Sequence, residues 1–147
     1  MAEHRPGVTI RPWQARDRVA VQSLLRVLDE SADGVLAERA EVTTGAPVYV
    51  AERQGVVVGM VTLCTYTTLT GAKAYLDHLV VAPEARRSGV GRALVEYAIE
   101  RAKDAGASRV DLTARASKHA AHALYRSLGF ELRKTSNFRL RFLAERD

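Results

Sequence analysis

Residues 79–94 read LVVAPEARRSGVGRAL, and this stretch decides the predicted fold. A β-branched apolar run leads into a loop that carries Gly89 and Gly91, and a helical pattern begins there. Backbone amides at the start of a helix have no acceptor within the helix and lie at the positive end of its dipole. Glycines also let a phosphate approach the backbone closely. The stretch therefore predicts a diphosphate site, with added positive charge from three arginines: Arg86, Arg87 and Arg92.

Two common phosphate-binding loops do not match this stretch. A Walker A loop needs Gly-Lys followed by Ser or Thr, and the chain contains no such tripeptide. A dinucleotide fingerprint needs a third glycine three residues after Gly91, where this chain has Leu94. The loop therefore indicates a diphosphate-bearing ligand that is held by another pattern.

Residues 86–91, RRSGVG, resemble the [Q/R]-x-x-G-x-[G/A] loop with which the GNAT family of N-acetyltransferases binds acetyl-CoA. The Val-x-Pro at residues 81–83 is similar to the family's approach to that loop. Downstream, residues 123–130 read ALYRSLGF and resemble the family's A-x-x-L-Y-x-x-x-G-F helix and strand start. Together with the order of elements, the resemblance covers nearly the whole chain.

The elements on both sides of the loop complete the predicted fold. β-branched runs predict strands, and apolar residues at i, i+3, i+4 and i+7 predict helices. We expect an α/β fold in which helices cover a mixed sheet. The expected helices cover residues 17–28, a short stretch within 29–45, 90–106 and 117–128, the last capped by Ser117. The expected strands cover residues 8–11, 47–53, 56–66, 74–81, 109–113, 130–133 and 138–142.

The resemblance implies a mixed, mostly antiparallel central sheet that is splayed between its fourth and fifth strands and flanked by helices. In that fold the pantetheine arm of acetyl-CoA pairs with the fourth strand, here residues 74–81, and the diphosphate lies over residues 87–92. Lys118 stands where many members carry Asn, seven residues before a tyrosine, which leaves that contact open. The implied cofactor-binding residues are Leu79, Val80, Val81, Arg86, Arg87, Ser88, Gly89, Val90, Gly91, Arg92 and Lys118.

By the same resemblance, an acceptor amine attacks the thioester directly and CoA leaves as a thiolate. Tyr125 matches the general acid of the family, and a phenol with a pKa of about 10 suits an alkyl thiolate. The alternative interpretation of Tyr125 is a core tyrosine beneath the turn at Gly129.

A carboxylate interrupts the apolar strand expected over residues 74–81. Residues 75, 77, 79 and 81 share one face of a regular strand, so Asp77 projects with Tyr75 and His78 points to the opposite face. Asp is disfavoured in strands, and GNAT members often place a base, or a carboxylate that holds a water, on this strand. Asp77 is therefore expected as the base, with a hydrogen-bonded structural Asp as the alternative. His78 is expected to be structural.

The segment between the first two helices usually lines the acceptor site in this fold. Here it is acidic, which favours a cationic primary amine, and a solvated helix face is the alternative. Its five carboxylates stand against only Arg39, and they are Asp29, Glu30, Asp33, Glu38 and Glu41.

Composition indicates one ordinary globular domain. The chain has 147 residues, 47% of them hydrophobic and 27% charged, so we expect a flexible tail over 1–7 and a single domain over 8–147. Cys64 is the one cysteine, which excludes an internal disulfide. No apolar run suits a signal peptide or a membrane helix, so a cytoplasmic location is expected. No metal site is expected.

Two other classes of protein remain as alternatives. A non-catalytic acyl-CoA-binding module would keep the loop without needing an acid or a base. A nucleic-acid-binding protein is suggested only by the net charge of +5, because the basic residues are dispersed and form no known motif. The expected partners are acetyl-CoA and an amine acceptor, without a membrane; nucleic acid is disfavoured and a homodimer stays open.

Overall fold

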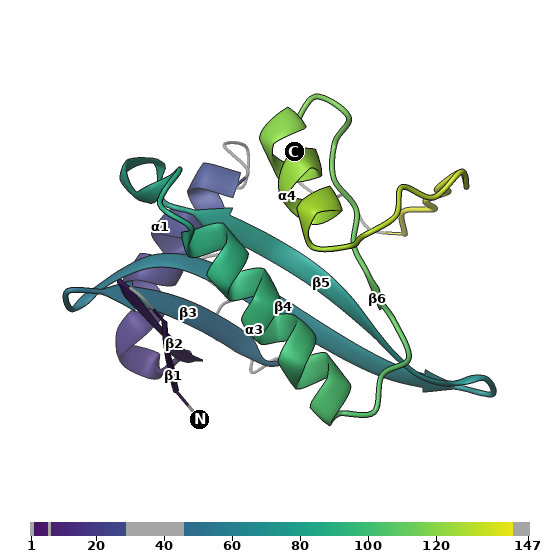
Figure 1. The fold of residues 1–147 in the computed structure, drawn as a ribbon, viewed down its shortest axis with the longest axis horizontal. Coiled ribbons are helices and arrows are strands. Elements are labelled where there is room, and N and C mark those ends of the chain that lie inside the picture. Colours follow the sequence, from purple (N-terminus) through teal and green to yellow (C-terminus); the bar gives the residue numbers. More distant parts are fainter. Residues whose placement is uncertain (1, 6, 29–45, 143–147) are drawn as a thin grey trace. The chain divides into compact units, whose positions relative to one another are not determined.

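The computed structural model describes residues 2–5, 7–28 and 46–142. The short helix and the acidic acceptor segment expected within 29–45 lie outside the described residues. The chain divides into two compact units, Met1–Leu112 and Thr113–Asp147, and each is described by itself. Figure 1 follows the described elements along the chain by colour.

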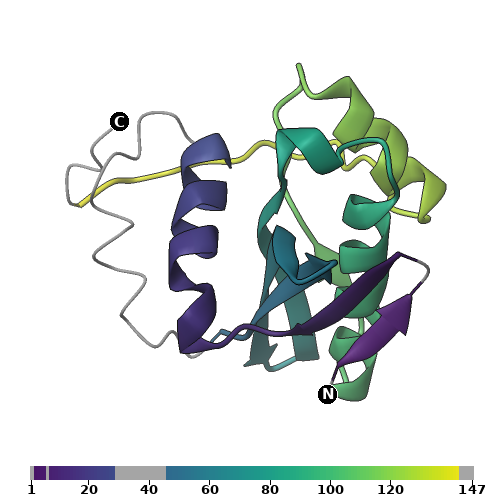
Figure 2. The same cartoon turned by 90° about the vertical axis from the view of Figure 1, so that its left-hand side faces the viewer.

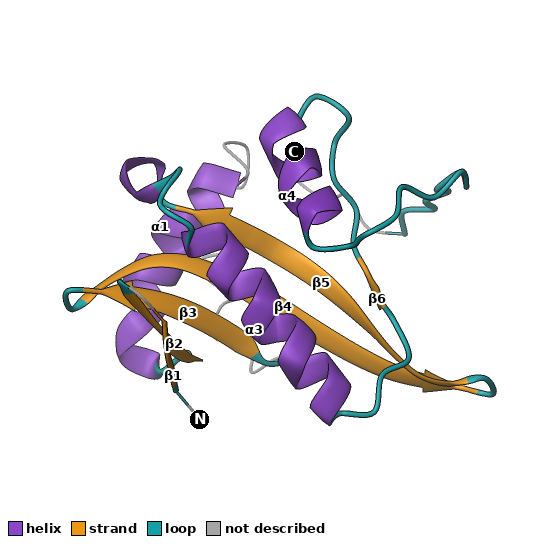
Figure 3. Cartoon of the chain, in the orientation of Figure 1, coloured by secondary structure: helices purple, strands orange, loops and turns teal. Residues whose placement is uncertain are grey.

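The first unit is built on one sheet whose described strands lie in chain order, from β1 to β6 (Figure 3). The first five strands pair antiparallel, and β6 runs parallel to β5. This confirms the predicted α/β class with a mixed, mostly antiparallel sheet. The strands are β1 Glu3–Arg5, β2 Val8–Pro12, β3 Val48–Arg53, β4 Val56–Thr68, β5 Gly71–Val81 and β6 Val110–Asp111.

Two helices cover opposite faces of this sheet (Figure 1, Figure 2). They are α1, Arg18–Leu28, and α3, Val90–Asp104, and both pack on β4 and β5. β4 is buried without interruption over residues 58–63, as expected for a strand that is covered on both faces. The predicted helical spacing is confirmed in α1, whose buried side chains are Val21, Leu24 and Leu25.

Gly59 lets the first turn of α3 lie directly against β4. A Cβ at this position would be 2.9 Å from Leu94 Cδ1 and 3.2 Å from Val90 Cγ1. It would also be 3.2 Å from the carbonyl oxygen of Val80 on β5. Both α3 side chains are buried. The close approach therefore holds the start of α3, and the loop before it, against the end of β5.

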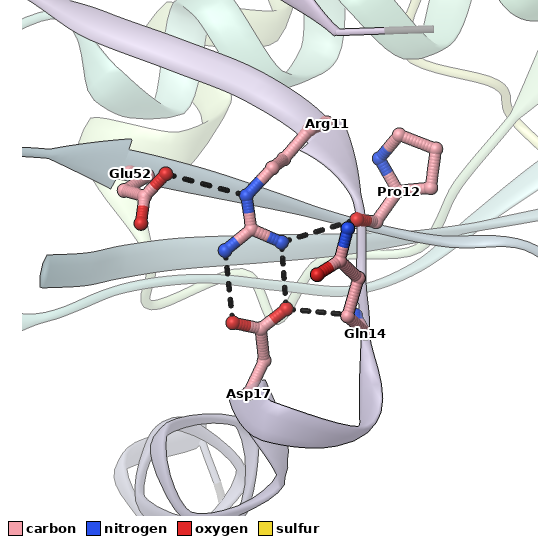
Figure 4. A network of polar contacts seen from close by, with 5 residues as sticks. All are labelled: Arg11, Pro12, Gln14, Asp17 and Glu52. Carbon is pink, nitrogen blue, oxygen red and sulfur yellow. Dashed lines mark hydrogen bonds and ion pairs between the residues drawn. The ribbon is translucent and has the colours of Figure 1, made fainter. Parts of the chain in front are cut away.

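Arg11 joins β2 to two other elements through a buried ion-pair network (Figure 4). Its Nη1 and Nη2 donate to the two carboxylate oxygens of Asp17 at 2.7 and 2.9 Å, and its Nε donates to Glu52 on β3 at 3.3 Å. Asp17 ends a short 3-10 helix, Ala15–Asp17, and also accepts the backbone N–H of Gln14 at 2.7 Å. The network therefore orders the turn that leads from the sheet into α1.

The second unit contains α4, His119–Ser127, within the helix predicted over residues 117–128. The N-cap is Lys118, and no side chain caps the helix. The predicted cap at Ser117 was therefore wrong, because the first helical turn starts one residue later.

A Schellman motif ends α4. The N–H of Phe130 donates to the carbonyl of Tyr125 at 3.0 Å, and the N–H of Gly129 donates to the carbonyl of Arg126 at 3.1 Å. Gly129 has φ +91°, the left-handed conformation that this motif requires. The motif therefore sets the chain direction directly after Tyr125.

The two strands predicted over residues 130–133 and 138–142 are not formed in the described chain up to Phe142, so this prediction was wrong. Apolar and basic residues alternate over residues 138–142, as in a strand with one buried face. The apolar side chains are nevertheless 95%, 77% and 89% exposed at Phe138, Leu140 and Phe142. Alternation alone does not make a strand, because a strand needs a paired neighbour and a surface to cover.

Strand β1 lies within the stretch predicted as a flexible tail over 1–7. Glu3 pairs with Ile10 and Arg5 with Val8, so this part of the chain extends the sheet by one strand. The single domain predicted over 8–147 stays a prediction. No helix in the described part of the chain is long and apolar enough to cross a membrane.

Candidate functional site

The loop between β5 and α3 has the geometry of an anion cradle. The N–H of Ala82 donates to the carbonyl of Val58 at 2.8 Å and ties the end of β5 to β4. A short 3-10 turn, Pro83–Ala85, follows, and the hydroxyl of Ser88 donates to the carbonyl of Ala85. Arg87 and Gly89 are left-handed, with φ +60° and +82°. These turns bring the chain directly into the first turn of α3.

The start of α3 is open to a ligand. Gly89 is the N-cap, and a Cβ on it would meet no atom within 4 Å. The first amides of a helix have no acceptor within it, and they carry the positive end of the dipole. Arg86 and Arg87 are exposed beside them, whereas Arg92 Nε bridges to Glu96 Oε1 at 2.7 Å. Open amides and exposed guanidinium groups together fit a phosphorylated ligand.

β5 has a long edge that β6 does not cover. Ala74 pairs with Val110 and Tyr75 with Asp111, and the two strands share no further pairs. From Leu76 to Val81, β5 therefore has no strand partner on this side within the described chain. The expected fourth and fifth strands, residues 74–81 and 109–113, correspond to β5 and β6. The uncovered edge therefore matches the splay that is expected between them. Leu79, Val80 and Val81, expected to contact the pantetheine arm, lie in this part of β5.

A β-bulge interrupts β5 beside Asp77. Thr62 on β4 pairs with Asp77, but Met60 pairs with Val80, so β5 has one extra residue between these pairs. His78 lies in the bulge with φ +50°. Because cross-strand partners share a face, Val80 lies on the same face as Asp77. The strict alternation assumed from the sequence therefore fails after residue 77.

The bulge brings His78 beside Asp77. The Nδ1 of His78 lies 3.3 Å from Thr62 Oγ1, and its Nε2 lies 3.7 Å from Asp77 Oδ2. The backbone N–H of His78 donates to Asp77 Oδ1 at 2.8 Å. The prediction that His78 points away from Asp77 was wrong, because the extra residue breaks the two-residue period.

Cys64 belongs to the same part of the sheet. It pairs with Tyr75 on β5, and it is partly buried. Burial raises the pKa of the Cys64 thiol, and the nearby negative charge of Asp77 raises it further. Sequence reasoning gave no role to Thr62 or Cys64. Only the β4–β5 register brings them to Asp77, and the register has no local sequence signal.

Tyr125 and Lys118 belong to the second unit. Burial raises the pKa of the Tyr125 phenol, and its ring contacts Phe130 in an edge-on arrangement. Lys118 is the N-cap residue of α4 and is exposed. Both predicted roles, general acid and cofactor contact, stay predictions. Among the described residues, no three His, Cys, Asp or Glu side chains gather in a group that could hold a metal ion.

The structure therefore gathers one set of predicted residues on a single run of chain. Asp77, residues 79–81 with their expected contact to a pantetheine arm, and the loop over 86–92 follow one another along β5 and into α3. A ligand that lay along the uncovered edge of β5 would have its diphosphate at the cradle and its other end near Asp77. This is the order that a thioester on a long phosphorylated arm requires.

Comparisons with known proteins agree with this geometry. The chain matches the model of the Acetyltransferase (GNAT) family over residues 10–130. It is 38% identical to human "N-acetyltransferase 8" over 123 residues, which are 82% of this chain and 51% of that protein. A 58-residue stretch is 45% identical to the "[Ribosomal protein bS18]-alanine N-acetyltransferase" of Escherichia coli K12, covering 40% of this chain and 39% of that one. The chain thus spans only part of the length of either relative.

Solved structures share the fold. A "Putative acetyltransferase from Agrobacterium tumefaciens" superposes with a TM-score of 0.78 at 27% identity, over 90% of this chain and 98% of that one. A "Ribosomal-protein-alanine N-acetyltransferase" from Brucella melitensis has a TM-score of 0.77 at 23% identity, over 92% and 99% of the two chains, a likeness of fold alone. Since the family model matches residues 10–130, which is most of the chain, the chain belongs to the Acetyltransferase (GNAT) family.

Proposed function

We propose that this chain transfers the acetyl group of acetyl-CoA directly to a primary amine. Membership of the family supports the reaction class. The observation that carries the proposal is the cradle at the start of α3, which follows directly on the uncovered edge of β5. The arrangement suits a ligand with a diphosphate at one end and an extended arm that needs backbone partners.

The proposed roles follow from the chemistry of a thioester. The amine nitrogen attacks the carbonyl carbon, the C–S bond breaks, and CoA leaves as a thiolate. Tyr125 is the proposed general acid for that thiolate, because a phenol is protonated at neutral pH and can donate its proton to an alkyl thiolate. Asp77, at the bulge of β5, is the proposed carboxylate that receives the acceptor, as base or as the holder of a water.

Each cofactor-binding residue has a proposed contact. Backbone groups of Leu79, Val80 and Val81 pair with the pantetheine arm. The amides of residues 88–91, with Arg86, Arg87 and Arg92, hold the diphosphate. Lys118 adds a positive charge from the second unit.

The acceptor is proposed to be a primary amine, with cationic amines favoured by the acidic residues within 29–45. A curated relative acts, by its name, on an alanine of ribosomal protein bS18. The first acceptor panel therefore includes a peptide with an N-terminal alanine, a lysine peptide, a polyamine and an aminoglycoside.

The test is a thiol-release assay over this panel, with acetyl-CoA as the donor. Amine-dependent release of free CoA, together with a product heavier by one acetyl group, is the expected result. Binding of acetyl-CoA without thiol release from any amine would favour a non-catalytic acyl-CoA-binding module. An absence of acetyl-CoA binding would contradict the assignment of the cradle itself.

A further inference from the structure

We propose that His78, rather than Asp77 itself, takes the proton from the acceptor amine, and that Thr62 and Asp77 are its positioning residues. The inference rests on the proposed acetyl transfer and names the group that accepts the proton in that same site. It is based on the position of the His78 side chain between Thr62 and Asp77. The imidazole of His78 contacts a buried threonine through one nitrogen, and its other nitrogen faces an exposed carboxylate.

The backbone at this point places the imidazole where a regular strand would not. His78 has φ +50° in the middle of β5, a conformation that is uncommon for a residue other than glycine. In the bulge, the side chain of His78 contacts both Thr62 and Asp77, which pair across β4 and β5. Without the extra residue, His78 and Asp77 would lie on opposite faces of the sheet.

Thr62 can act as the acceptor for one ring nitrogen of His78. Its side chain is buried, and its Oγ1 lies 3.3 Å from His78 Nδ1. When Nδ1–H donates to this oxygen, Nε2 keeps its lone pair, because the hydrogen bond on one ring nitrogen sets the state of the other. The proposed tautomer is therefore the one in which Nδ1–H donates to Thr62 and Nε2 can act as a base.

Asp77 places a carboxylate beside the imidazole of His78. Its Oδ1 already accepts the backbone N–H of His78 at 2.8 Å, so this half of the carboxylate holds the bulge. Its Oδ2 lies 3.7 Å from His78 Nε2, which is too long for a direct hydrogen bond. Two acceptors that face each other at this distance can both contact one ammonium group.

Substrate can reach this pair of groups. The side chains of His78 and Asp77 are 38% and 53% exposed. They lie on the part of β5 that has no partner from β6 in the described chain. An acceptor amine that approaches the arm of acetyl-CoA along this edge passes both groups before it meets the thioester.

The proton step is balanced. The ammonium proton moves to Nε2, and the imidazolium that forms is stabilised by the carboxylate of Asp77. The freed nitrogen lone pair then forms the C–N bond, the C–S bond breaks, the thiolate takes a proton from Tyr125, and the new amide nitrogen loses its extra proton to solvent. Solvent reprotonates Tyr125 and removes the proton from His78.

The main variant is His78→Asn. Asn tolerates the left-handed conformation and keeps a polar group beside Thr62, but it cannot accept the proton. We expect kcat/KM at pH 7 to fall by roughly 10²-fold or more, and the loss to narrow as pH rises and free amine becomes abundant. Affinity for acetyl-CoA, measured by calorimetry, should stay within about twofold of the parent, since the cradle lies elsewhere on the chain.

Three further variants separate positioning from folding. Thr62→Val removes the acceptor for Nδ1–H, so it should change the pH profile in the same way as His78→Asn, with a smaller loss of kcat/KM. Thr62→Ser keeps the hydroxyl and should keep the kcat/KM and pH profile of the parent. Thr65→Val, at an exposed site of the same strand, is the matched control and should leave activity unchanged. If His78→Asn does not fold, His78→Gly serves instead, because glycine adopts the same φ freely.

The outcomes separate the two proposals. If the parent transfers acetyl to no amine, the proposed function fails and this inference fails with it. If the parent is active but His78→Asn keeps its rate and pH profile, only the inference fails. A loss that is equal at every pH also overturns it, because a structural role would produce that result.

Discussion

The ring of Tyr125 stands edge-on to the ring of Phe130, with centroids 5.7 Å apart and planes inclined by 61°. The two residues are also joined by the hydrogen bond from Phe130 N–H to Tyr125 O, at 3.0 Å. The Schellman motif that ends α4 therefore sets both the backbone and the ring of Tyr125. The phenol hydroxyl is not needed for either contact, which separates its chemistry from its packing.

Tyr125→Phe tests the proposed general acid. The ring contact with Phe130 is kept, so the free energy of unfolding and the affinity for acetyl-CoA should change little. Loss of a general acid should lower kcat by roughly 10²–10⁴, and less where water protonates the thiolate. The measurement compares kcat with acetyl-CoA affinity in the same variant. Full activity would leave Tyr125 as a packing residue.

Tyr125→Leu is the contrast that tests packing. It removes the ring as well as the hydroxyl, so the edge-on pair with Phe130 is lost. Aromatic pairs contribute about 0.5–1.5 kcal/mol beyond the area they bury, so stability should fall by at least this amount. Chemical denaturation of both variants should show the drop only in Tyr125→Leu.

Gly91→Glu tests the cradle. A carboxylate in the first turn of α3 would lie where a diphosphate is proposed, and like charges repel. Acetyl-CoA should then no longer raise the melting temperature, as a bound ligand does by mass action. Ala105→Glu adds the same charge just beyond the other end of α3 and should leave that shift intact. Parent-like binding by Gly91→Glu would remove the loop from the cofactor site.

Asp77→Asn tests the carboxylate at the bulge. An amide oxygen can still accept the N–H of His78, so the bulge should persist, while the negative charge is lost. Turnover should fall mainly at low pH, where fewer acceptor amines are already deprotonated. The measurement is kcat/KM across pH 6 to 9 with one amine. A parent-like profile would exclude Asp77 from the proton transfer.

Asp17 should make the free energy of unfolding depend on pH in the acidic range. The hydrogen bonds from Arg11 hold the pKa of the Asp17 carboxyl below its usual value. Its contribution is therefore complete above the unfolded pKa of about 3.9 and is lost as pH falls through the lower folded pKa. Asp17→Asn leaves Arg11 short of a buried partner and should cost about 3 kcal/mol at pH 7. Urea unfolding at pH 7 and below pH 3 should show the difference from the parent shrinking in acid.

Gly59→Ala should disturb the packing of α3 against β4. The added Cβ would be 2.9 Å from Leu94 Cδ1 and 3.2 Å from the carbonyl of Val80, which is backbone and cannot turn away. Overpacking of this kind costs about 1–3 kcal/mol. The double variant with Leu94→Ala should lose less stability than the sum of the single variants, because the shortened side chain relieves the contact. Strict additivity would mean that the two residues do not press on each other.

Local chemistry made much of the fold predictable. β-branched runs predicted β3 and β4, and helical spacing predicted α1. The apolar residues of these patterns are largely buried in the structure. The cradle could also be found, because a strand, glycines and a helix start within a few residues carry its geometry in sequence order. Such features depend on neighbours along the chain, so the sequence contains the whole signal.

Alternation of apolar and polar residues gave wrong strand predictions where it was the sole criterion. The alternating residues 138–142 lack a paired strand in the described chain, and β1 forms in a stretch without a clear pattern. Pairing depends on what the rest of the sheet offers at its edges, and a single segment does not encode this.

The sequence by itself determined the family, the cradle and the candidate residues Asp77 and Tyr125. Only the tertiary structure decided that Thr62 and His78 meet at Asp77, and that Arg11 reaches Glu52 on β3. Each of these contacts joins different strands, and one depends on a bulge that shifts the register by a single residue. A one-residue shift leaves composition and hydrophobic period nearly unchanged but moves every later side chain to the other face, so only the folded sheet reveals it.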